Sequence, residues 1–177
     1  MTGAIEYGKA LFLITEEDGT TEKVIGDVKI VRTVFLNNPD YAKLLDTPSL
    51  NKEERVALVD KAFYGLDGSL LNLIKIITEK RLAHKLDAIF EAYLNCYDDS
   101  RGILRVDAVT AVALSSEQNA ALTKKLGALT GKTVIVKNSV DRAILGGIKL
   151  RYGGIQLDGS VKTRLAKFEA ALRETVV

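Results

Sequence analysis

The chain has 177 residues and a formal net charge of +2, from 25 basic and 23 acidic side chains. Hydrophobic residues make up 47% and charged residues 27%, which is typical of a soluble globular protein and excludes disorder as the main state. One cysteine and one histidine exclude an internal disulfide framework, a cysteine-based zinc site and a histidine-rich metal cage. The near balance of charge argues against a strongly electrostatic nucleic-acid-binding protein.

The first hundred residues are predicted to form about six short helices, which is typical of a helical bundle. Val24, Val28, Val31 and Phe35 recur at the spacing of one helical face. Asn51 followed by Glu54 matches a capping box, and Ser69 is expected to cap the fifth helix. The predicted helices cover residues 7–17, 21–35, 39–45, 52–63, 70–79 and 82–100.

The hydrophobic period changes from 3.6 to two after Gly102, where a strand is predicted over residues 104–114 with its second half buried on both faces. Ser115 and Gln118 match a second capping box, and Gly131 is expected to end the helix that it opens. Further predicted elements are a strand at 132–137, a hairpin of 148–152 and 155–157, and a final helix with Leu165, Phe168 and Leu172 on one face.

These patterns predict an α+β protein with two domains. Residues 1–102 would form an N-terminal six-helix bundle, and residues 103–177 a small C-terminal α/β domain with a mixed sheet. The N-terminus has no basic stretch followed by an apolar one, so no secretory signal is expected. The most apolar stretch, residues 70–77, is too short to span a membrane.

Residues that could carry chemistry have simpler structural roles. Gly146-Gly147 and Gly153-Gly154 are separated by an alternating strand, which favours a bulge and a hairpin turn over a phosphate-binding loop. Asp158 and Ser160 have no histidine near them in sequence and are predicted to cap the last helix. His84 is expected to face solvent. The sequence therefore predicts no catalytic residue, no cofactor site and no metal site.

Two helices carry more apolar surface than one side of a small bundle needs. Residues 10–14 and 70–77 are apolar nearly all round. Such surplus surface indicates either burial on all sides or a partner that covers the rest. We expect a groove between these helices that takes an amphipathic helix. The candidate anchor residues are Leu11, Ile14, Leu70, Ile74 and Ile77.

Several segments resemble one family. The run from Asp141 to Leu150, followed by Asp158-Gly159-Ser160, and the N-terminal Tyr7-Gly8-Lys9-Ala10-Leu11-Phe12 are similar to the delta subunit of bacterial and chloroplast F-type ATP synthases. The mitochondrial relative of that subunit is the oligomycin-sensitivity-conferring protein. The resemblance covers nearly the whole chain. It departs at Gly8, where alanine is usual and helix propensity falls by about 0.5–1 kcal/mol, and at Gly154, where an acidic turn residue is common.

The resemblance implies a non-catalytic stator subunit, present in one copy in a hetero-oligomeric complex that supports ion-gradient-driven ATP synthesis. The first and fifth helices of the bundle would hold the N-terminal helix of an alpha subunit, and these are the two over-apolar helices. Ile74→Asp or Ile77→Asp would then weaken that contact while the fold persists.

The C-terminal domain would face the peripheral-stalk b subunits, so that the catalytic head cannot turn with the central shaft. The resemblance places such a protein at the cytoplasmic face of the bacterial cell membrane, with no direct insertion, no nucleic-acid partner and no cofactor.

Three alternatives remain open at this point. A small enzyme that uses the glycine pairs would bind nucleotide saturably. A nucleic-acid-binding module would lose affinity steeply as salt rises. A generic adaptor that holds another helix is the most serious alternative, because the apolar surface does not identify the protein that covers it.

Overall fold

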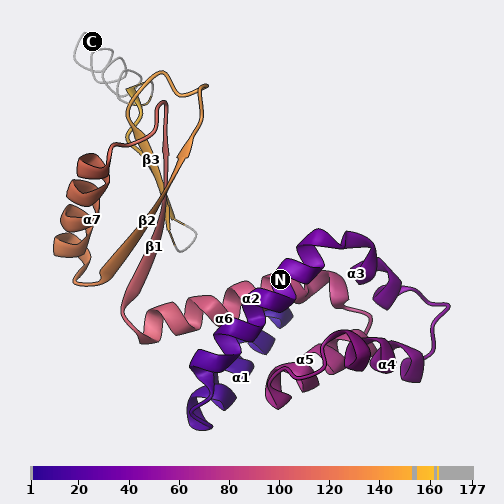
Figure 1. The fold of residues 1–177 in the computed structure, drawn as a ribbon. Helices are drawn as coiled ribbons and strands as arrows, with labels where there is room; N and C mark the ends of the chain where they lie inside the picture. Colours follow the sequence, from indigo (N-terminus) through magenta and orange to yellow (C-terminus); the bar gives the residue numbers. More distant parts are fainter. Residues whose placement is uncertain (1, 153–154, 162, 164–177) are drawn as a thin grey trace, which may run out of the picture. The chain divides into compact units, whose positions relative to one another are not determined.

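A computed structural model describes residues 2–152, 155–161 and 163 of the chain (Figure 1). The chain divides into two compact units, Met1–Tyr97 and Asp98–Val177. The described residues form seven α-helices, one short 3-10 helix and a four-stranded mixed sheet, so the predicted α+β class is confirmed. The predicted domain boundary at Gly102 lies shortly after this division.

The first unit is built from helices (Figure 1). They are α1 (Thr2–Glu17), α2 (Thr21–Asn37), α3 (Pro39–Asp46), α4 (Lys52–Ala62), α5 (Gly68–Glu79), the 3-10 helix η1 (Ala83–Lys85) and α6 (Leu86–Ser100). Helix α6 continues across the division between the two units. The grouping of these helices into one six-helix bundle stays a prediction. None of the helices in the described ranges is both long and apolar enough to cross a membrane.

The ends of the helices follow local side-chain chemistry. Asn51 Oδ1 accepts from the backbone N–H of Glu54 at 2.8 Å and Glu54 Oε2 accepts from that of Asn51 at 2.9 Å, which confirms the capping box. The expectation that Ser69 caps α5 is wrong. Asp67 holds that position, and its carboxylate accepts from the Ser69 N–H at 3.0 Å. An aspartate carboxylate can accept a hydrogen bond from the backbone N–H two residues later in the chain, which is the contact that caps α5.

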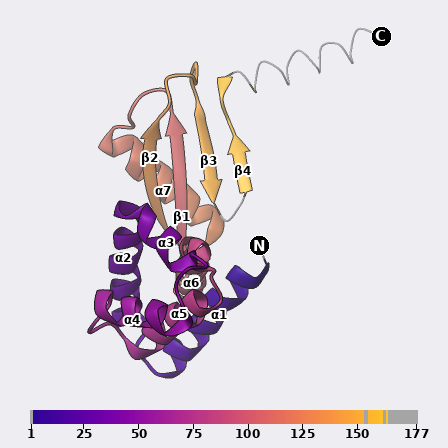
Figure 2. The ribbon, with the colours of Figure 1, turned by 90° about the vertical axis from the view of Figure 1, so that its right-hand side faces the viewer.

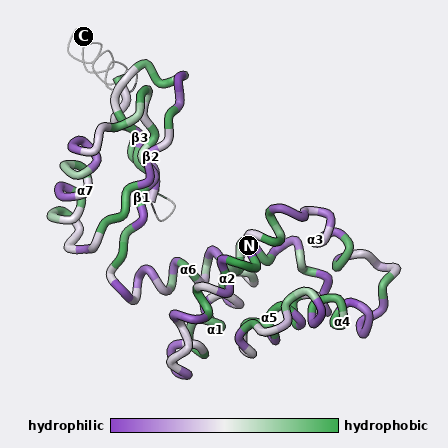
Figure 3. Tube along the Cα trace, viewed as in Figure 1, coloured by the Kyte–Doolittle hydropathy of each residue, from purple (hydrophilic) through white to green (hydrophobic). Residues whose placement is uncertain are grey.

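The core of the helical unit lies where the apolar faces of the helices meet, and Figure 3 shows hydrophobic residues along α5. Val24, Val28 and Val31 are completely buried, which confirms the predicted face of α2, and Phe35 is half-buried. Tyr93 is also completely buried, and its hydroxyl lies 3.2 Å from Thr15 Oγ1, so the phenol brings a satisfied polar group into the core.

The second unit contains the sheet, with strand order β2-β1-β3-β4 (Figure 2). Its elements are β1 (Ile103–Thr110), α7 (Ser116–Thr130), β2 (Thr133–Val140), β3 (Ile148–Tyr152) and β4 (Ile155–Asp158). Strand β1 runs parallel to β2 and antiparallel to β3, and β3 and β4 form the predicted hairpin. The predicted turn at Gly153-Gly154 and the apolar stripe of Leu165, Phe168 and Leu172 lie outside the described residues.

Helix α7 begins and ends as predicted and covers one face of the sheet. The capping box of Ser115 and Gln118 forms, and Gly131 ends the helix with φ 68°. Strand β1 is shorter than predicted, because the Thr110 hydroxyl donates to the Val112 carbonyl at 2.7 Å where the chain turns away from the sheet. Val112 is consequently 74% exposed, so the expectation that this end of the strand is buried on both faces is wrong.

Candidate partner-binding site

The structure places the five predicted anchors in two different environments. Leu70, Ile74 and Ile77 have no exposed surface and Leu11 is 2% exposed, whereas Ile14 is 48% exposed. The three α5 residues follow one another by four and three positions, so they share the inner face of that helix. A side chain with no accessible surface contacts a partner only if the unit opens. That any of the five binds a partner stays a prediction.

A polar contact fixes how α1 and α5 adjoin. Lys80, which follows the last residue of α5, donates from Nζ to Tyr7 Oη on α1 at 2.7 Å. Steps of three and four residues from Tyr7 lead along one side of α1, and the same steps back from Lys80 lead along the adjoining side of α5. We call these two stripes the α1–α5 surface, formed by Tyr7, Ala10, Ile14, Leu73, Ile76 and Lys80.

The α1–α5 surface is apolar and partly open to solvent. Ile14 is 48% exposed on α1 and Ile76 is 44% exposed on α5, while Leu73 is 9% exposed and lies beneath them. Sequence reasoning missed Ile76 because it selected Leu70, Ile74 and Ile77, and period alone does not show which stripe of the helix faces the core. The signal was present: Ile76 falls three residues after Leu73, on a different stripe from Ile74.

Ion pairs join α5 to α4. Lys75 pairs with Asp60 at 2.5 Å, and Glu79 pairs with Lys52 at 3.0 Å. Lys75 and Glu79 are four residues apart, so they mark one side of α5. Ile76 is 44% exposed despite these contacts with α4, so it stays accessible to another helix.

Metal-ligating side chains do not cluster in the described part of the chain. Its residues include no group of three or more histidine, cysteine, aspartate or glutamate side chains that could hold a metal ion. A pocket of about 390 Å³ lies between the start of α1 and α6, and its lining is mostly small and apolar. The lining residues are Gly3, Ala4, Ile5, Lys85, Ala88, Glu91, Ala92 and Asn95.

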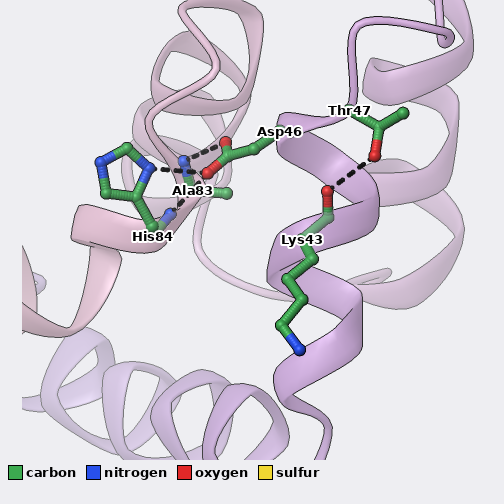
Figure 4. Close-up of polar contacts among 5 residues, drawn as sticks. All are labelled: Lys43, Asp46, Thr47, Ala83 and His84. Atoms are coloured by element: carbon green, nitrogen blue, oxygen red, sulfur yellow. Dashed lines mark hydrogen bonds and ion pairs between the residues drawn. The ribbon is translucent and has the colours of Figure 1, made fainter.

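His84 has a structural partner (Figure 4). Its side chain is 58% exposed, as expected, but Nδ1 lies 2.7 Å from Asp46 Oδ2. The same carboxylate, at the end of α3, accepts the backbone N–H of Ala83 at 2.7 Å and that of His84 at 3.1 Å. Asp46 thus satisfies the free N–H groups at the start of η1, so this pair holds two segments of the helical unit together.

Gly146-Gly147, the glycine pair in the described part of the chain, packs closely against residues 159–161 rather than forming an open phosphate-binding loop. Gly147 has φ 86°, and a Cβ there would lie 2.6 Å from the Gly159 carbonyl oxygen. Asp158, one residue earlier, has a pKa lowered to about 2, first by the Ser160 side chain and then by its backbone N–H. Ser160 Oγ in turn accepts from the Thr163 N–H at 3.4 Å. These contacts support structural roles, rather than phosphate binding or catalysis, for the glycine pair and for Asp158 and Ser160.

Comparisons with known proteins agree with one another. The sequence profile of the family described as ATP synthase delta (OSCP) subunit matches residues 4–172. The ATP synthase subunit delta of Leuconostoc citreum is 32% identical over 170 residues, covering 96% of this chain and 94% of that protein. The subunit delta of Clostridioides difficile is 31% identical, covering 98% and 97%. A chain in the cryo-EM structure of the Toxoplasma gondii mitochondrial ATP synthase hexamer shares the fold, with a TM-score of 0.72, 22% identity and 96% coverage of both chains.

Proposed function

The chain belongs to the ATP synthase delta (OSCP) subunit family, and from this premise we propose which surface of its helical unit binds the catalytic head. The chain is a non-catalytic stator component of F-type ATP synthase and a peripheral component of that membrane-bound complex. A generic adaptor with another partner is not favoured.

The proposed partner of the α1–α5 surface is the N-terminal helix of an alpha subunit, bound to a six-helix N-terminal bundle. The second unit would meet the peripheral-stalk b subunits, with one copy of the chain at the cytoplasmic face of the membrane. The observation that carries the proposal is the exposure of Ile14 and Ile76 on adjoining helices. An amphipathic helix laid along two apolar stripes would remove both side chains from water.

The mechanical task explains why such a contact must be apolar and tight. A stator resists torque through contacts in series, so the weaker of the two determines when the link fails. Nanomolar affinity corresponds to about −12 kcal/mol, and a few central apolar anchors usually supply most of such an energy. Ile14 and Ile76 are the exposed candidates on this surface, with Leu73 beneath them.

Titration calorimetry of the full chain with a synthetic peptide of the alpha N-terminal segment tests this proposal. We expect one-to-one binding with a negative heat-capacity change, because apolar surface is buried. Ile14→Asp and Ile76→Asp should each weaken binding at least about tenfold. The matched control is Ile30→Asp, at a position of α2 that is 57% exposed and outside this surface. Equal affinity of all three variants and the original chain would refute the site.

A further inference from the structure

The sheet of the second unit has one face covered by α7, and the described residues of this unit leave the other face, here called the open face, uncovered. In Figure 2, α7 lies behind the strands of its own unit. The covered face carries Val106, Ala108 and Val134, which are buried. Because side chains alternate along a strand, the residues between these point to the open face. Strands β1 and β2 are parallel, and parallel strands usually have both faces covered.

The open face carries a row of charges across three strands. Asp107 in the middle strand is opposite Lys137 on one side and Arg151 on the other, and all three residues are exposed. The register thus places one carboxylate between two cations, and no ion pair joins Asp107 to either of them among the described residues. Neighbouring charges are paired already, since Arg105 Nη2 donates to Asp98 at 2.9 Å.

Basic side chains outnumber acidic ones on this face. The basic residues are Arg105, Lys137, Lys149 and Arg151, and the acidic residues are Asp107 and Asp158. Lys149 and Asp158 pair with each other at 3.4 Å. The positive excess of the open face therefore lies at Lys137 and Arg151.

The open face also has apolar residues beside these charges. Ile135, two residues before Lys137 on β2, is 43% exposed. Val109, two residues after Asp107 on β1, is half-buried. A face that exposes large aliphatic side chains next to cations is suited to a partner that has an apolar stripe flanked by carboxylates.

We propose that the open face of the sheet binds an acidic amphipathic helix of the peripheral stalk, with the apolar stripe of that helix on Ile135 and Val109 and its carboxylates toward Lys137 and Arg151. This inference rests on the proposed contact between the second unit and the stalk. Charges at the rim of such an interface mainly set the association rate and its dependence on salt.

The experiment measures binding of the full chain to the purified soluble stalk portion of the b subunits of the same synthase, at low and at physiological salt. The test variant is Lys137→Glu with Arg151→Glu. The control is Lys124→Glu with Lys125→Glu, which makes the same change of charge at exposed positions of α7, on the other side of the sheet. We expect the test variant to bind at least about tenfold more weakly with a smaller salt dependence, and the control to change less than about twofold.

A third variant distinguishes weaker binding from loss of the fold. Asp107→Asn removes the carboxylate between the two cations and should tighten binding, a result that misfolding cannot produce. Binding that falls equally in the test and control variants, or is unchanged in the test variant, would overturn the open-face site while leaving the stalk contact standing. Failure of the original chain to bind the stalk portion would instead overturn the stalk contact, and the open-face site with it.

Discussion

Gly8 on α1 lies so close to Ile89 on α6 that a Cβ at position 8 would come within 2.5 Å of the Ile89 carbonyl oxygen. The same Cβ would lie 2.7 Å from the Cβ of Ala92. Both contacts are far shorter than van der Waals separation, so the two helix backbones touch at this point. From the sequence alone, Gly8 only lowers the helix propensity of this segment. In the fold, its missing side chain allows the first and last helices of the unit to meet.

Gly8→Ala is therefore expected to destabilise the helical unit by about 1–3 kcal/mol, the usual cost of overpacking. Alanine has the better helix propensity, by about 1 kcal/mol, but the steric conflict with α6 outweighs it. Gly26→Ala on α2 is the control, because a Cβ there has no neighbour within 4 Å. It should stabilise the protein by about 0.5–1 kcal/mol. Urea unfolding of both variants checks the prediction, and stabilisation in both would contradict the contact.

Ile74→Asp should unfold the helical unit rather than merely weaken a partner contact. Ile74 has no exposed surface, and a carboxylate buried there without a partner costs about 3 kcal/mol or more. Ile76→Asp, two residues away and 44% exposed, should keep the fold. Circular dichroism of the two variants makes the comparison. If Ile74→Asp keeps native helicity and thermal stability, the sequence-based expectation that this position faces the partner would be restored.

Local signals in the sequence predicted both capping boxes and the buried face of α2, and contacts between distant segments account for most of what the sequence analysis missed. The box at Asn51 and the face of α2 need only neighbours along the chain. The predicted helix over residues 82–100 is interrupted at its start because Asp46, from another helix, holds the N–H groups of η1. Likewise, the period of α5 shows that Ile74 and Ile76 lie on different sides, but only the positions of α1 and α4 decide which side is covered.

Asp46→Ala should lower the stability of the helical unit by about 1–2 kcal/mol, the range for loss of a helix cap. The change removes the acceptor of the Ala83 and His84 N–H groups and the partner of the His84 ring (Figure 4). Thr47→Ala is the neighbouring control, since the Thr47 hydroxyl donates to the Lys43 carbonyl in the adjoining turn of α3 and makes no hydrogen bond with another helix among the described residues. Thermal unfolding measures both. A loss of equal size in the two variants would contradict the role of Asp46.

Arg55→Met should leave the stability of the protein unchanged or raise it. Arg55 is only 4% exposed, and its Nε and Nη1 have no hydrogen-bond partner among the described residues. Replacing a buried, poorly paired charge with an apolar side chain of similar length is often neutral or stabilising, by about 1–4 kcal/mol. Arg55→Ala is the control, because it removes the charge but also leaves a cavity and should destabilise. Chemical denaturation that shows Arg55→Met to be clearly less stable than the original chain would show that the guanidinium itself stabilises the fold.

Asp158 should make the end of the second unit sensitive to strong acid. Hydrogen bonds from the Ser160 side chain and backbone N–H lower the Asp158 pKa from 3.8 to about 2. Because the folded pKa is the lower one, this stabilisation is fully present above pH 3.8 and is lost as the pH falls through about 2. Carboxyl chemical shifts followed by NMR should show Asp158 titrating near the lower value, and Ser160→Ala should move the midpoint upward. Asp158→Asn should lack this part of the pH dependence of thermal unfolding. A midpoint near 3.8 in the original chain would refute the interaction between Asp158 and Ser160.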